Sequence, residues 1–194
     1  MEKKKSNLTL WLILAICVLP FVSAVGLFFY WTPNQLVNYG DLVDPKPLPD
    51  FFNKHSDKVE ELMHASRGKW LLLIVDSGNC NSICQKKLYW LRQIRLAQGR
   101  EMERVGRVWL INDLAQPSDE LLGQFVGTEL MRLADEDLLF TGVDNTPPEK
   151  NLFLVDPLGN LMMRYSIDSD PNKLKKDLKK LLKVSKAIKY RGDR

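Results

Sequence analysis

The sequence predicts an α/β domain, with helices flanking a central mixed sheet, that follows one N-terminal transmembrane helix. The apolar run of residues 8–31 predicts the membrane segment. After it, the hydrophobic patterns follow the order strand, helix, strand, helix, β-hairpin and helix, which is typical of an α/β fold. Cys80 and Cys84 stand at the start of the first long helix of that series, shortly after its first strand. A chain of 194 residues has room for one such domain and an anchor.

The membrane helix is predicted over residues 8–31, which contain no charged residue. At ~1.5 Å per residue this run is long enough to cross a hydrocarbon core. Three lysines at 3–5 precede it, and the next basic residue is Lys46. Because positive residues are retained in the cytoplasm, we predict a cytoplasmic N-terminus over 1–7, a single pass through the inner (cytoplasmic) membrane, and a periplasmic C-terminal domain.

The alternative for this segment is a cleaved signal peptide. The apolar run is longer than the core of a typical signal peptide, and Ser23-Ala24 is only a weak cleavage site. The sequence therefore favours a permanent anchor and leaves cleavage as the alternative.

Residues 32–52 predict an extended linker, because the four prolines at positions 33, 45, 47 and 49 oppose helix formation. The folded domain is expected over residues 53–194. It opens with a short helix at 56–65, and a strand follows at 70–75. This strand is apolar without alternation, as expected of a central strand that is covered on both faces.

The remaining elements follow from the same periodicities. They are a helix at 80–98, a buried strand at 107–112, a short helix at 118–125, a hairpin of strands 152–155 and 161–165, and a final helix from Pro171. In the helix at 80–98, Lys86, Lys87 and the arginines are interleaved with the apolar positions. The final helix carries a leucine stripe, with lysines between that are expected to face water.

Composition excludes several function classes. The formal net charge of +4 comes largely from the lysine-rich N-terminus and the final helix, and no nucleic-acid-binding motif accompanies it. A basic, solvated face explains this charge better than a nucleic-acid partner does. The sequence also lacks a Ser-His-Asp set, a phosphate-binding loop and a zinc-ligand spacing, so hydrolase and nucleotide-binding functions have little support.

The cysteine pair carries the chemistry of the domain. Cys17 lies in the membrane segment, so Cys80 and Cys84 are the two thiols of the exported part. Helix N-terminal amides favour a thiolate, and positions i and i+4 of a helix bring Cα atoms to about 6 Å, which a disulfide can bridge. The alternative is a structural disulfide that staples residues 77–83 and does nothing else. The small polar residues around the pair favour an exposed, reachable loop.

Three motifs together resemble the Sco/SenC family: Gly68-Lys69-Trp70 before the strand, Cys80-x-x-x-Cys84 after it, and Leu152-Phe-Leu-Val-Asp-Pro-Leu-Gly159 in the hairpin. The resemblance extends over about 50–182 and implies a thioredoxin-like fold. Sco/SenC proteins are membrane-anchored and help to assemble the copper site of cytochrome c oxidase. The resemblance therefore implies an oxidase subunit or another assembly factor as partner.

The sequence departs from this family at one ligand. Sco proteins bind copper with the two cysteines and a histidine just before the hairpin strand, a place that falls near Pro148 here. His55 and His64 both precede the first strand and are expected to be solvated surface residues. Two thiolates can still hold copper(I), a soft ion, and Met162 or Met163 of the hairpin could complete such a site. No cofactor is certain from these residues, and copper(I) is the one that Cys80 and Cys84 could hold.

The resemblance also suggests a role for Pro148. Many thioredoxin-like enzymes place a cis-proline opposite the cysteine pair, and Pro147-Pro148 stands at about that position. A cis bond at Pro148 would leave a backbone edge open to a partner, so Pro148 is predicted as a partner-contacting residue.

The missing histidine favours thiol–disulfide chemistry over a stable copper site. Cys80, nearer the helix start, is the expected nucleophile, and Cys84 is the expected resolving thiol. The predicted function is assistance to cytochrome c oxidase assembly by thiol–disulfide exchange. The alternatives are a copper(I) chaperone that uses the same two sulfurs and a non-catalytic assembly scaffold.

Overall fold

The computed structural model describes residues 3–30, 38–52, 57–133, 140, 143 and 146–192. It divides the chain into two compact units, Met1–Val37 and Asn38–Arg194. The predicted domain boundaries at residues 31 and 52 remain predictions.

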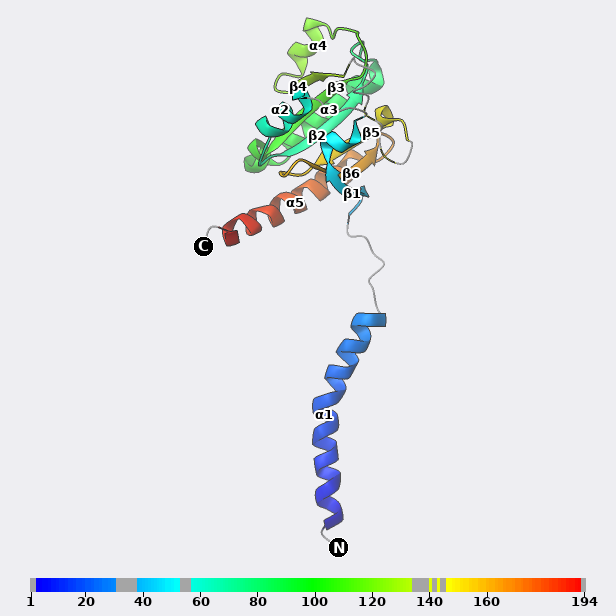
Figure 1. The fold of residues 1–194 in the computed structure, drawn as a ribbon, viewed down its shortest axis with the longest axis vertical. Coiled ribbons are helices and arrows are strands. Elements are labelled where there is room, and N and C mark those ends of the chain that lie inside the picture. The colour runs from blue at the N-terminus through cyan, green and yellow to red at the C-terminus, as the bar shows by residue number, and fades with distance from the viewer. Residues whose placement is uncertain are drawn as a thin grey trace. The chain divides into compact units, whose positions relative to one another are not determined.

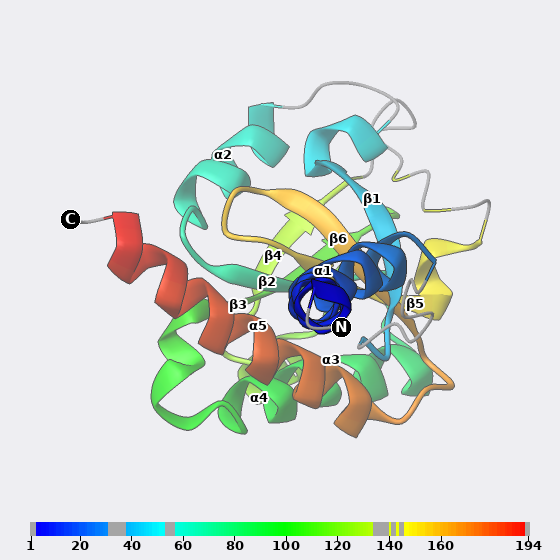
Figure 2. The same cartoon turned by 90° about the horizontal axis from the view of Figure 1, so that it is seen from below.

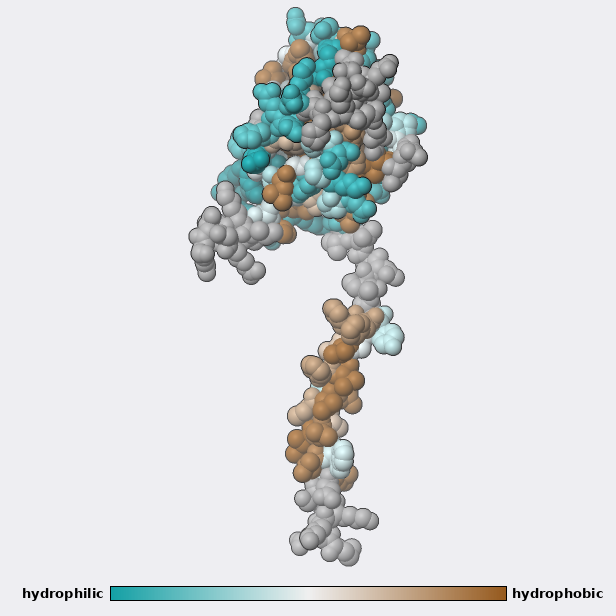
Figure 3. Space-filling view, in the orientation of Figure 1, coloured by the Kyte–Doolittle hydropathy of each residue, from teal (hydrophilic) through white to brown (hydrophobic). Residues whose placement is uncertain are grey.

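The first unit contains the helix α1, Lys3–Tyr30. Its part Leu8–Tyr30 has a mean hydropathy of 2.7 and is long and apolar enough to cross a membrane. Figure 3 shows its apolar side chains in brown along the helix. The hydroxyl of Ser23 donates to the carbonyl of Leu19 at 2.8 Å, which satisfies this polar group within the helix.

The second unit is built on one six-stranded sheet (Figure 1). In sheet order its strands are β1 (Asp41–Pro47), β6 (Asn160–Ser166), β5 (Asn151–Val155), β2 (Trp70–Asp76), β3 (Val105–Ile111) and β4 (Glu129–Arg132). Strands β2, β3 and β4 are parallel, whereas β5, β6 and β1 pair antiparallel with their neighbours. The sheet is therefore mixed, as the sequence predicts.

Helices cover both faces of this sheet (Figure 2). They are α2 (Asp57–Ala65), α3 (Ser82–Leu96), α4 (Asp119–Gln124) and α5 (Pro171–Gly192), with 3-10 turns η1 (Leu48–Phe51), η2 (Gly99–Arg104) and η4 (Pro148–Lys150). Leucines of α3, α4 and α5 share one core cluster, and α2 and η1 contribute to the other. The domain thus has three layers, helix, sheet and helix.

Strand β2 shows why the two cores form. Trp70, Leu72 and Ile74 point into the α3–α5 cluster. Leu71, Leu73 and Val75, the alternate positions, point into the α2 cluster. Since side chains of a strand alternate between faces, an apolar run without alternation must be covered on both sides. The prediction of a central, doubly covered strand is confirmed.

Two strands lie where the sequence predicts none. Strand β1 forms within the predicted linker, where it pairs with β6 through Asp41↔Arg164 and Lys46↔Leu161. Prolines are tolerated at a sheet edge because the missing N–H can face solvent, so Pro45 and Pro47 do not prevent pairing there. Strand β4 has four residues and lies at the opposite edge. Both edge strands lack the apolar run that identifies β2.

Asp177 of α5 holds β1 to the domain. Its side chain is buried, and its Oδ2 accepts hydrogen bonds from the backbone N–H groups of Tyr39 (2.7 Å) and Gly40 (3.1 Å). The hydroxyl of Tyr165 in β6 donates to the same oxygen at 3.1 Å. Burial, followed by the Asp177 carboxylate, raises the pKa of Tyr165, so this phenol stays a donor at any physiological pH.

We expect Asp177→Ala to lower the free energy of unfolding by ~3 kcal/mol or more, because each donor left unsatisfied costs about 1–3 kcal/mol. Asp168→Ala, at an exposed aspartate nearby, should change it by less than ~0.5 kcal/mol. Denaturant unfolding of the full-length chain in detergent measures both. Equal effects of the two substitutions would contradict this role of Asp177.

Candidate functional site

The two cysteines lie where β2 passes into α3. They form a disulfide, with Cα atoms 5.0 Å apart, as their spacing predicts. The helix begins at Ser82 rather than at Cys80, because Asn81 is its N-cap. The Asn81 Oδ1 accepts hydrogen bonds from the backbone N–H groups of Ile83 (2.9 Å) and Cys84 (3.1 Å). Cys80 therefore precedes the helix, and Cys84 lies in its first turn.

Cys80 has an unusual backbone conformation. Its φ is 39°, and it is the one non-glycine residue with a positive φ in the described part of the chain. This left-handed conformation costs an L-residue about 1–2 kcal/mol, and such residues often lie at functional sites. The Cys80 carbonyl accepts a hydrogen bond from Gln85 Nε2 at 3.1 Å, which helps to hold this geometry.

The cysteine loop is fastened to the loop that follows β3. The Asp113 Oδ1 accepts hydrogen bonds from the N–H groups of Gly78 (2.9 Å) and Ala115 (3.1 Å). The Ser77 hydroxyl and these N–H groups lower the pKa of Asp113. Gly78 is required here, since a Cβ would overlap the carbonyl of Ala115. Asp113 thus acts as a clamp between the two loops.

Both cysteines are buried, although the sequence predicts an exposed, reachable loop around them. Cys84 is fully buried and Cys80 is 2% exposed, although Asn79, Asn81 and Ser82 around them are exposed. The polar residues around the pair thus predict correctly that the loop is exposed, but they do not predict whether the cysteine side chains are. Cys80 nevertheless lines a pocket of about 350 Å³, together with Gln85 and residues of the segment 116–124. Cys80 is therefore buried but borders this pocket.

Lys87 is a site residue that the sequence analysis misses. Its side chain is fully buried, and its Nζ lies 2.6 Å from the Asp76 carboxylate. It also donates to the carbonyls of Val75 (3.1 Å) and Glu149 (2.7 Å). Burial lowers the pKa of Lys87, and the hydrogen bond and charge of Asp76 oppose that shift. The helical spacing Cys84, Lys87, Leu91 could have revealed it, because these positions share one helix face.

Pro148 lies near this buried pair but is not a cis-proline. No peptide bond among the residues that the structure describes is cis, and these include both bonds at Pro147 and Pro148. The expected cis bond at Pro148 is therefore wrong. Pro148 starts η4, and the next residue, Glu149, accepts from Lys87 through its carbonyl. The Glu149 Oε1 also accepts from Asn112 Nδ2 at 2.6 Å, which joins η4 to the end of β3.

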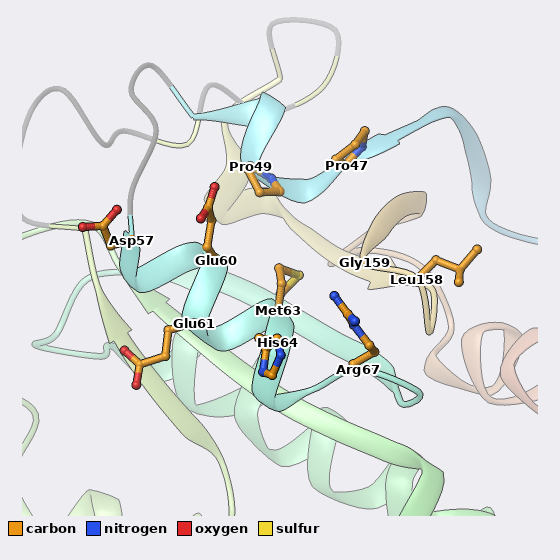
Figure 4. A pocket seen from close by; sticks show the side chains of 10 residues that line it. All are labelled: Pro47, Pro49, Asp57, Glu60, Glu61, Met63, His64, Arg67, Leu158 and Gly159. Atoms are coloured by element: carbon orange, nitrogen blue, oxygen red, sulfur yellow. The ribbon is translucent and has the colours of Figure 1, made fainter.

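The structure places His64 away from the cysteines. It is an exposed residue of α2, as predicted, and lines a pocket of about 590 Å³ with Met63, Arg67 and Leu158 (Figure 4). That pocket lies at the turn between β5 and β6, next to the start of β2, whereas the cysteines follow the end of β2. Strand β2 has seven residues and is therefore about 20 Å long, which separates His64 from the cysteines. His55 lies outside the described residues.

The donor set offers two sulfur atoms for a metal ion. Within the described ranges, no group of three or more His, Cys, Asp or Glu residues is arranged to hold a metal. Met163 is buried in the core, where its sulfur accepts from the Tyr165 hydroxyl at 3.5 Å, and Met162 packs against that core. Two thiolates fit copper(I) as a transient cargo but do not form a complete copper(II) site.

The comparison with protein families identifies the domain. The family model described as transmembrane-like, thioredoxin-like, C-terminal domain matches residues 70–185, which is more than half of the chain. The chain belongs to this family. The matched segment of this transmembrane-like, thioredoxin-like protein runs from β2 into α5 and includes the cysteine pair.

Solved structures share its fold. Yeast Sco1 matches with a TM-score of 0.52 and 16% identity, over 63% of this chain and 84% of that one. Yeast Sco1 with copper bound matches with a TM-score of 0.51 and 13% identity, over 77% and 95%. These likenesses confirm the predicted thioredoxin-like fold. No curated protein matches the sequence significantly.

We expect Lys87→Met to lower the free energy of unfolding by about 3–5 kcal/mol, because it leaves Asp76 as an unpaired buried charge. Lys86→Met is the matched control, at the adjacent exposed lysine whose Nζ lies 4.8 Å from the Trp90 ring centroid. It should cost no more than about 1 kcal/mol. Denaturant unfolding distinguishes the two. The double variant Asp76→Leu/Lys87→Met should recover part of the loss, and failure of any such recovery would contradict the pairing.

The clamp at Asp113 predicts a pH dependence. Because the folded state lowers the pKa of Asp113, its contribution is fully present above the pKa of an unfolded aspartate, about 3.9, and is lost as the pH falls through the lower folded value. We therefore expect the wild type to be more stable than Asp113→Asn at neutral pH, with the difference shrinking below about pH 4. Unfolding curves measured from pH 7 to acid test this. A difference that stays constant throughout would contradict it.

Proposed function

We propose that this protein carries out thiol–disulfide exchange through Cys80 and Cys84 and thereby assists the assembly of cytochrome c oxidase. The observation that carries the proposal is the disulfide at the start of α3, with Cys80 lining a pocket and Cys84 enclosed behind it. This arrangement separates a partner-facing sulfur from a resolving one. The Sco-like fold and the motifs of the sequence support oxidase assembly as the setting.

The exchange follows from the positions of the two sulfurs. In the reduced protein, the Cys80 thiolate attacks one sulfur of a client disulfide, a mixed disulfide forms, and the first client thiolate leaves. The Cys84 thiolate then attacks Cys80 Sγ and releases the second client thiolate. Two electrons pass to the client, whose cysteines end reduced and ready to bind copper. A dithiol donor must restore the reduced protein.

Local charges favour the thiolates that this scheme needs. The N–H groups of the first turn of α3 and the helix dipole stabilise negative charge at the cysteines. The buried ammonium group of Lys87 lies one helical turn after Cys84 and is held by Asp76.

The second candidate is a copper(I) chaperone that uses the same two sulfurs. The observation that favours it is the pair itself, since cysteines close enough to form a disulfide can both coordinate one soft ion. In the structure of yeast Sco1 with copper bound, the shared fold holds copper in that protein. Here copper(I) would be cargo, with the third ligand supplied by the partner.

The proposed location is the inner membrane, with α1 as the anchor and the thioredoxin-like domain in the periplasm. The lysines before α1 support this orientation. An oxidizing compartment also suits a protein whose cysteines cycle through a disulfide. The client would be an oxidase subunit or another assembly factor.

The deciding experiment titrates the reduced, full-length protein in detergent with copper(I) against a competing chelator, and in parallel equilibrates it in glutathione buffers. We expect no retained copper, and a dithiol–disulfide equilibrium. Cys84→Ser should trap a mixed disulfide with glutathione disulfide, with release of one glutathione thiolate, and Cys80→Ser should not. Copper retention that disappears in Cys80→Ser would instead establish the chaperone. Full oxidase assembly with a Cys80→Ser/Cys84→Ser double variant would leave only a scaffold role.

A further inference from the structure

The outward face of α5 is rich in lysine, and at its far end Lys186 pairs with Glu101 of η2 at 3.0 Å. Leu174, Leu178 and Leu182 pack into the core and fix the orientation of the helix. On its other side, lysines occupy positions 173, 175, 176, 179, 180, 183 and 186, and all but Lys175 are exposed. The one acidic residue over this length, Asp177, is buried and is used within the domain. Surface helices usually mix both signs, so this face is suited to an anionic partner.

The chain enters the domain at the same face. Tyr39 and Gly40 follow the segment that connects to α1, and Asp177 binds their N–H groups. The ammonium groups of Lys176 and Lys180 lie 5.8 Å and 5.5 Å from the centroid of the Tyr39 ring, within cation–π range. The entry point of the chain is thereby fixed to the middle of the lysine face.

The length of the connecting chain limits how far this face can lie from a membrane. Residues 31–37 separate the end of the apolar span at Tyr30 from Asn38. A fully extended chain reaches at most ~3.5 Å per residue, so Tyr39 stays within about 30 Å of the end of that span. The lysine face itself, from Lys173 to Lys186, extends about 20 Å along α5 at ~1.5 Å per residue. The connecting chain is thus short enough to keep Tyr39 near a bilayer that holds α1.

We propose that the lysine face of α5 binds anionic phospholipid headgroups on the membrane that holds α1. Ammonium groups pair with phosphate oxygens, and the lysine stems can lie along the interfacial region. The covalent connection keeps the lipid at high effective concentration, so the individual contacts can be weak. A lipid surface also needs no shaped pocket, which agrees with a convex helix face. This proposal rests on α1 as a membrane anchor and is independent of the thiol chemistry.

The test places the full-length protein in nanodiscs of neutral phosphatidylcholine or of phosphatidylcholine with phosphatidylglycerol. An amine-reactive reagent labels exposed lysines, and mass spectrometry gives the rate at each position. We expect Lys176 and Lys180 to react about fivefold more slowly in the anionic discs, the factor that corresponds to ~1 kcal/mol per basic residue near an anionic leaflet. High salt should remove this protection. Lys58 of α2, on the other face of the sheet, should react equally in both.

Variants separate lipid binding from other causes. The triple variant Lys173→Gln/Lys179→Gln/Lys183→Gln should lose most of the protection at Lys176 and Lys180. The matched control Lys46→Gln/Lys58→Gln/Lys69→Gln removes the same charge elsewhere and should keep it. Equal labelling rates in neutral and anionic discs would overturn the proposal. So would protection that appears only after an acidic protein is added, because that would identify a protein partner for this face.

Discussion

The buried ion pair between Lys87 and Asp76 is the interaction on which the site depends. Lys87 joins α3 to the end of β2 through Val75 and Asp76, and to η4 through the carbonyl of Glu149. Lys87 thus links three segments, one of which, α3, carries Cys84. A buried charge is tolerated only when its partners satisfy it, so Lys87 also fixes where those partners must lie. The position of Cys84, one turn earlier on α3, follows from this constraint.

A second set of contacts, all hydrogen bonds, holds the cysteine loop in place. Asp113 fastens Gly78, the Asn81 cap starts the helix, and Gln85 holds the carbonyl of Cys80. Together they keep Cys80 in a left-handed conformation at the pocket wall. The loop is therefore preorganised by polar contacts and the helix by a buried ion pair. A partner would meet an exposed loop with the buried Cys80 at the wall of a pocket.

The sequence predicts the central elements of this fold well, and its errors have physical causes. Strand β2 is an unbroken apolar run, and the cysteine helix and the hairpin carry periodic patterns, so all three are found, although the helix begins at Ser82 and not at Cys80. Strand β1 is missed because an exposed edge strand has no alternation to detect. Lys87 is missed because residue type suggests a solvated lysine, and only its partners from β2 and η4 make burial tolerable. Those partners are distant in sequence, so local patterns do not identify them.

Asp177 binds the backbone just before β1, and this limits where the chain can be truncated to obtain the second unit alone. A truncation at Asp50, in the η1 turn, would remove β1, open the edge of β6 and take away two of the donors that satisfy Asp177. An unpaired β6 edge would invite association between copies of the domain. A cut before Asn38 would retain both features. The boundary of the independent domain is therefore set by a carboxylate on its last helix.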